Sequence, residues 1–100
     1  MPSPVTAKSQ TSCFSLGQVI ATPGALAAFA KTGEGPLPFL VRHQAGDWGD
    51  LDPEDQKENN LAVFLGDRIL SAYKLSDQTK IWIITEADRS STCIFLPEEY

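Results

Sequence analysis

The sequence predicts an α+β domain, in which an antiparallel sheet of three to four strands carries helices packed mainly on one face. Two observations predict this class. Residues 80–97 contain two runs rich in β-branched and aromatic residues around a short polar link, as two adjacent antiparallel strands do. The preceding half of the chain contains helix start and stop signals. The expected order of elements is β-α-α-α-β-β-β.

The N-terminal third predicts one strand and one helix. Residues 1–12 are small and polar, so we expect a disordered lead-in, with a single domain over 13–100. Alternating side chains predict a strand over 16–21, which we expect to join the C-terminal strands. A helix over 23–32 follows from Thr22 as N-cap, a proline at the first helical position and a glycine after the end. Its Leu26, Phe29 and Ala30 are expected to face the sheet.

Two more helices are expected before the remaining strands. The first covers 37–45, with both of its prolines in the first turn. The second covers 53–65 and has the clearest start, with Asp52 as N-cap and two carboxylates in the first turn. We expect its Leu61, Phe64 and Leu65 to point inward.

Three strands joined by short links, over 68–75, 80–85 and 92–96, predict an antiparallel meander. Both faces of 80–85 are largely apolar, which indicates a central strand. Such a strand is covered on both sides, or covered on one side and used for association on the other. A homodimer formed through the sheet is therefore one possible assembly.

Length and composition are those of one soluble domain of 100 residues, with 42% hydrophobic and 21% charged residues. No apolar run reaches the length of a membrane span, and residues 1–12 lack the apolar core of a secretory signal. We therefore expect a cytoplasmic protein without a cofactor. Cys13 and Cys93 are then expected to be reduced thiols that act as small buried hydrophobic residues.

The acidity of the chain is concentrated in residues 46–67, where seven acids and one lysine give a net charge of −6. The whole chain has a net charge of −5, so the rest of the sequence is close to neutral. This sign disfavours nonspecific binding to nucleic acid, whose affinity comes mainly from phosphate contacts. The block is either a solvated helix start that favours carboxylates or a face that meets a basic protein.

The first candidate site is the segment 46–52, in which Asp47 and Asp50 supply oxygen ligands and His43 supplies an imidazole. The spacing does not fit a calcium loop, and no cysteine lies nearby to complete a zinc site. The other interpretation is structural: the acids cap turns and a helix start, and Trp48 folds back onto the core as a lid.

The second candidate is the turn 85–90, which brings Glu86, Asp88 and Arg89 to one edge of the sheet. Two carboxylates beside an arginine could perform acid–base chemistry if burial separated their pKa values. They could equally form a turn with exposed ion pairs. The chain contains no phosphate-binding loop, nucleophile elbow, dinucleotide fingerprint or paired Cys-x-x-Cys motif.

Four segments, 14–26, 46–51, 69–73 and 80–90, together resemble a family of small uncharacterised bacterial proteins carried on plasmids and integrated mobile elements. The resemblance covers about residues 13–100. Members bear labels such as plasmid-related protein or type I restriction subunit M. Because this chain has no glycine-rich cofactor loop and no Asn-Pro-Pro-Tyr-type motif, we expect no methyltransferase activity in it. The resemblance implies no catalytic residues.

The leading hypothesis is a non-catalytic protein-interaction module of a mobile element, which binds a host or element-encoded protein through an acidic loop and helix face. Its expected contact residues are Asp47, Trp48, Asp50, Glu86, Asp88 and Arg89. The alternative is a small metal-assisted hydrolase or nuclease that uses His43, Asp47, Asp50 and Glu86, with the first three as metal ligands. A mimic of DNA would need a denser carboxylate array than one acidic block provides.

Overall fold

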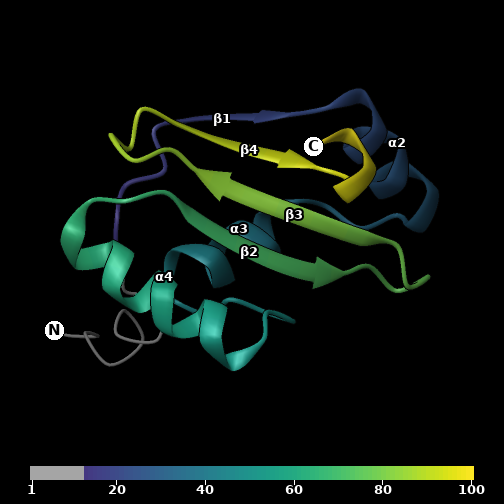
Figure 1. Ribbon diagram of the computed structural model, residues 1–100. Coiled ribbons are helices and arrows are strands. Elements are labelled where there is room, and N and C mark those ends of the chain that lie inside the picture. Colours follow the sequence, from purple (N-terminus) through teal and green to yellow (C-terminus); the bar gives the residue numbers. More distant parts are fainter. Residues whose placement is uncertain (1–12) are drawn as a thin grey trace, which may run out of the picture.

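The computed structural model describes residues 13–100; the expected lead-in over 1–12 lies outside the described residues. Three helices and a four-stranded sheet make an α+β fold (Figure 1). The elements are β1 (Gln18–Ala21), α2 (Pro23–Thr32), α3 (Leu37–Gln44), α4 (Pro53–Leu65), β2 (Ile69–Lys74), β3 (Lys80–Thr85), β4 (Ser91–Phe95) and the short 3₁₀ helix η1 (Pro97–Glu99).

The sheet has the strand order β1-β4-β3-β2. The predicted meander is confirmed, because β2 pairs antiparallel with β3 and β3 with β4, and β3 is an inner strand. The prediction of a wholly antiparallel sheet is wrong: β1 pairs parallel with β4.

The C-terminus supplies the physical reason for the parallel pairing. The Glu99 carboxylate accepts hydrogen bonds from the Thr22 hydroxyl (2.6 Å) and from the backbone N–H groups of Gly24 (3.2 Å) and Leu96 (2.8 Å). Thr22 follows the end of β1, and Leu96 follows the end of β4. The two strands therefore end at the same place and run in the same direction.

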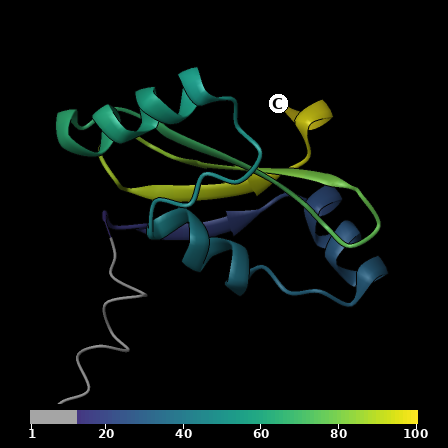
Figure 2. The ribbon, with the colours of Figure 1, turned by 90° about the horizontal axis from the view of Figure 1, so that it is seen from below.

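The helices do not all lie on one face. Helices α2 and α3 lie on one side of the sheet, whereas α4 runs along the outer edge of β2 and rises toward the opposite side, as η1 does (Figures 1 and 2). The expected packing on one face therefore holds for α2 and α3 only.

The main core lies between the sheet and the helices α2 and α3. It contains buried residues of both helices, inward-facing residues of β2, β3 and β4, and Leu75 directly after β2: Ala25, Phe29, Phe39, Leu40, Tyr73, Leu75, Ile81, Ile83 and Ile94. A smaller cluster of Trp48, Ala62 and Ile69 joins α4 to the edge of β2. Every buried side-chain nitrogen and oxygen atom within residues 13–100 has a hydrogen-bond partner.

The predicted helix boundaries agree with the structure within one residue, and those of α2 and α4 are set by local caps. The Thr22 side chain accepts from the Ala25 N–H, and the Asp52 side chain accepts from the Asp55 N–H. Gly33 and Gly66 end their helices in the left-handed conformation, at φ of 77° in both cases.

The predicted inward faces of two helices are partly wrong. In α2, Phe29 is buried as expected, but Ala25 takes the place expected for Leu26, which is exposed, as is Ala30. In α4, the inward residues are Asn59 and Ala62. The three large apolar residues expected inside are instead exposed, by 59% for Leu61, 87% for Phe64 and 69% for Leu65.

The side chain of Asn59 accounts for the orientation of α4. Its amide donates to the Leu70 carbonyl and accepts from the Leu70 N–H, so it pairs with the free edge of β2 as a neighbouring strand would. This contact fixes the Asn59–Ala62 face toward the sheet. Since successive helical residues turn by about 100°, Leu61 and Phe64 must then face away from it.

Both cysteines are free. Cys93 is partly buried in β4, but Cys13 is exposed, so the expectation of two buried cysteines is wrong for Cys13. Among the helices of residues 13–100, none is both long and apolar enough to cross a membrane.

Candidate functional site

His43 lies in the core, fully buried, at the centre of a chain of hydroxyl groups. Its Nδ1 is 2.6 Å from Ser71 Oγ, and its Nε2 is 2.9 Å from Thr85 Oγ1. Thr85 Oγ1 lies 2.7 Å from Thr92 Oγ1, and the Thr92 hydroxyl donates to the Leu16 carbonyl at 2.7 Å.

The carbonyl at the end of this chain fixes the direction of every bond. Because Thr92 donates its only hydroxyl proton to a carbonyl, it accepts from Thr85. Thr85 in turn accepts from His43, which therefore carries its proton on Nε2 and accepts from Ser71 at Nδ1. This is a neutral imidazole, and burial lowers the pKa of His43 from 6.5 to about 4.

Asp47 serves local structure. Its carboxylate accepts from Arg42 Nε at 2.7 Å and from the Gly49 N–H at 3.2 Å, while its backbone carbonyl accepts from the Tyr73 hydroxyl at 2.6 Å. The Arg42 hydrogen bond holds the pKa of Asp47 below its usual value. Both oxygen atoms of the carboxylate are thus already engaged by neighbours in the chain.

Trp48 is buried, as the interpretation of a lid on the core predicts, and its indole N–H donates to Asn60 Oδ1 at 3.0 Å. The following residues extend the sheet: Gly49 bridges to Ala72, and the Asp50 N–H donates to the Ala72 carbonyl at 2.7 Å. Gly49 has φ of 73°, and a Cβ atom there would lie 1.9 Å from the Ala72 carbonyl oxygen, so only glycine fits. Of the residues expected in this loop site, Asp50 alone has an exposed side chain without a hydrogen bond in the described chain.

The second loop is likewise held together by its own side chains. Glu86 lies 3.3 Å from Arg68, and the Asp88 carboxylate accepts from the Ser90 N–H. Arg89, with a positive φ of 60°, donates to four backbone carbonyls, those of Ala62, Asp67, Glu86 and Ala87. Arg89 thereby ties the end of α4 to the β3–β4 turn.

The structure does not bring the two loops together. Gly49 lies outside β2 beside Ala72, whereas Glu86 follows the end of β3, where Thr85 pairs with Ile69. Glu86 is therefore level with Arg68, four residues or about 13 Å along the strand from Ala72, and lies on the other side of β2 from Gly49. Within residues 13–100, no three His, Cys, Asp or Glu side chains are grouped so as to hold a metal ion. The set of His43, Asp47 and Asp50 is accordingly not assembled.

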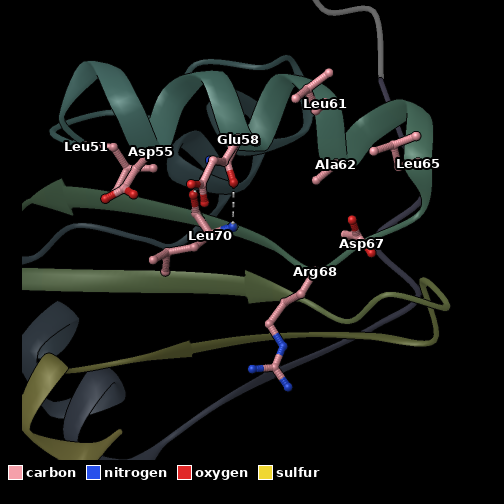
Figure 3. Close-up of a pocket in the computed structure, with 10 residues that line it drawn as sticks. Leu51, Asp55, Glu58, Leu61, Ala62, Leu65, Asp67, Arg68 and Leu70 are labelled. Atoms are coloured by element: carbon pink, nitrogen blue, oxygen red, sulfur yellow. Dashed lines mark hydrogen bonds between the residues drawn. The ribbon is translucent and has the colours of Figure 1, made fainter.

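A groove lies instead between α4 and β2, with a volume of about 410 Å³ (Figure 3). Helix α4 contributes carboxylates in its first half and leucines in its second, and Leu70 lies on the strand side. The residues that line it are Leu51, Asp55, Glu58, Asn59, Leu61, Ala62, Leu65, Asp67, Arg68 and Leu70. Sequence reasoning found the acidic part of this surface but placed its leucines in the core. The polar Asn59, in line with Ala62 on the helix, was the available signal for the true orientation.

No protein-family model matches the chain, and neither the curated proteins nor the solved structures contain a significant match to it. The functional argument therefore depends on the geometry described above.

Proposed function

We propose that this protein is a small non-catalytic interaction module of a bacterial mobile element, and that it binds a host or element-encoded protein through the acidic loop and the exposed face of α4. The exposure of Leu61, Phe64 and Leu65 on one short segment of helix carries this proposal. Clustered exposed apolar side chains on a small domain mark an interaction surface. The mobile-element context depends on the resemblance described above.

Burial of these side chains by a partner would supply a substantial driving force. Complete burial of a Leu or Phe side chain is worth about 1.5–3 kcal/mol, so the three together offer about 5 kcal/mol or more before the costs of association. Exposed carboxylates precede them on the same helix, at Glu54, Asp55 and Glu58. This combination of an apolar centre and a charged margin is typical of protein interfaces.

The arrangement of the ionisable groups supports binding over catalysis. A general base needs access to its substrate, and His43 is buried with both ring nitrogens engaged by hydroxyl groups. The Asp47 carboxylate is engaged by Arg42, and Glu86 by Arg68. The four residues of the alternative hydrolase or nuclease hypothesis therefore do not face a common point.

Site-specific photo-crosslinking tests the proposal. A photoreactive phenylalanine analogue replaces Leu65, which is 69% exposed, and in a matched variant it replaces Leu37, which is 67% exposed on α3. We expect a discrete protein adduct from position 65 in bacterial cells that express the protein, and none from position 37. The adduct should disappear when Leu61→Ser is added. Equal adducts from both positions, or none from position 65, would refute the proposal.

A further inference from the structure

We propose that the groove beside α4 accepts a basic amphipathic helix of the partner protein. The leucine-like side chains of that helix would contact the second half of α4, and its lysine or arginine side chains would contact the first half. This inference rests on the proposed function and specifies the chemistry of the partner. It follows from the order of side chains along one face of the helix.

The face of α4 that borders the groove changes character along its length. Asp55 and Glu58 line its first half, and Leu61 and Leu65 line its second half (Figure 3). Ten residues separate Asp55 from Leu65, which corresponds to about 15 Å along the helix axis. An occupant must therefore offer two chemically different halves over about three helical turns.

The acids of the first half form no salt bridge within the described chain. The salt bridges of residues 13–100 join Lys31 to Asp77, Arg42 to Asp47 and Arg68 to Glu86, and none includes Asp55 or Glu58. Arg68, the cation nearest in sequence to the apolar half, is already paired. Two carboxylates outside any salt bridge, beside an apolar surface, favour a partner with basic side chains at that end.

A second copy of the chain fits this face poorly. Two α4 helices packed antiparallel about a two-fold axis near residue 60, so that the whole groove face is used, would place Asp55 of each copy against Leu65 of the other. Carboxylates would then be buried against apolar surface without a partner, which is costly. The net charge of −5 on each copy opposes the approach further. The occupant that satisfies both halves is a basic segment of another protein.

An antiparallel arrangement also suits the dipole of the incoming helix. Its C-terminal half would lie against the first half of α4, where Asp55 and Glu58 stand. Lysine and arginine are favoured near a helix C-terminus. The expected sequence is therefore apolar first and basic second, with both kinds of residue at i, i+3, i+4 and i+7 spacing.

Fluorescence anisotropy with two synthetic probes tests this inference. The first is a labelled 18-residue helical peptide based on alanine. It has leucines on one face of its first half and lysines on the same face of its second half. The second probe carries glutamate in place of each lysine. We expect the lysine probe to bind, with at least tenfold weaker affinity at 0.3 M than at 0.05 M salt. The glutamate probe should not bind measurably.

Two matched variants locate the binding. Glu58→Lys and Glu98→Lys change the net charge equally, but Glu98 lies in η1 and does not line the groove. We expect at least tenfold weaker binding of the lysine probe for Glu58→Lys and less than twofold for Glu98→Lys. Equal effects of the two variants, or no binding of the lysine probe at either salt concentration, would overturn the inference.

The results separate this inference from the proposed function. If the glutamate probe binds as well as the lysine probe and Leu65→Ser weakens both, α4 is an interaction surface and only the basic partner is refuted. If the photo-crosslinking at position 65 also fails, the proposed function falls as well.

Discussion

On the side of α2 and α3, the sheet buries its apolar residues beneath two helices, and the one polar cluster around His43 is completely hydrogen-bonded. On the other side, α4 buries only Asn59 and Ala62 and exposes its three largest apolar residues. The two regions thus use the same kinds of residue in opposite ways.

The difference lies in how each helix is held. Helices α2 and α3 contribute Phe29, Phe39 and Leu40 to the core. Helix α4 depends more on polar contacts with the backbone, through the Asn59 amide on β2 and the Arg89 guanidinium on the Ala62 carbonyl. Because directional hydrogen bonds position this helix, its leucines are not needed for packing and stay exposed.

Two phenylalanines test this contrast with the largest expected effect. Phe39 is 8% exposed in the core, and Phe64 is 87% exposed on α4. Phe39→Ala should lower the free energy of unfolding by about 3–5 kcal/mol, because it removes buried surface and leaves a cavity. Phe64→Ala should change it by less than about 0.5 kcal/mol. Urea denaturation, monitored by circular dichroism, measures the free energy of unfolding of both variants. A loss of more than about 2 kcal/mol for Phe64→Ala would show that α4 packs as a core helix.

The parts of the fold that could be predicted from the sequence are those with local causes. Thr22 and Asp52 bond to N–H groups three residues away, so the starts of α2 and α4 are legible in the sequence. The parallel direction of β1 could not be predicted from the sequence, because it is associated with contacts between Glu99 and residues 75 or more positions earlier in the chain. The orientation of α4 likewise depends on Asn59 meeting the edge of β2, which no helical periodicity encodes.

The candidate site shows the same division. Sequence reasoning identified the acidic segment and the mixed-charge turn, and correctly expected Trp48 to cover the core. The side chain of Asp88 caps a residue two positions further on, which a turn interpretation anticipates. The groove itself could not be predicted, since it exists only because α4 turns Leu61 and Leu65 away from the sheet.

The pH dependence of stability tests the buried side of the sheet, where His43 lies. His43 has a pKa of about 4 in the folded protein and 6.5 as its ordinary value, so the unfolded chain binds the proton more tightly. The stability that neutral His43 contributes to the folded protein is therefore fully present above about pH 6.5 and is lost as the pH falls toward 4. At about 1.4 kcal/mol per pH unit, the free energy of unfolding should drop by about 2 kcal/mol between pH 7 and pH 5.

A variant without an imidazole is the control for this effect. His43→Gln keeps one donor and one acceptor, and its stability should stay nearly constant from pH 7 to pH 5. The aspartates and glutamates whose pKa values are lowered, among them Asp47 and Glu99, begin to affect stability only near their ordinary pKa values of 3.8 and 4.5. Urea titrations at several pH values give the free energy of unfolding of wild type and variant as a function of pH. Equal slopes for the two proteins between pH 7 and pH 5 would contradict the assignment of this pH dependence to His43.

The smallest effect is expected from the ion pair at the end of the exposed region. Arg68 and Glu86 lie 3.3 Å apart, with side chains 54% and 44% exposed. Solvent screens such a pair, so a double-mutant cycle with Arg68→Ala and Glu86→Ala should give a coupling energy of about 0.5 kcal/mol or less. Chemical denaturation of the four proteins measures it. A coupling energy above about 1 kcal/mol would mean that this pair helps to hold the strand ends together. A small value would mean that both charges can rearrange at little cost if the proposed partner helix binds in the groove, which Arg68 helps to line.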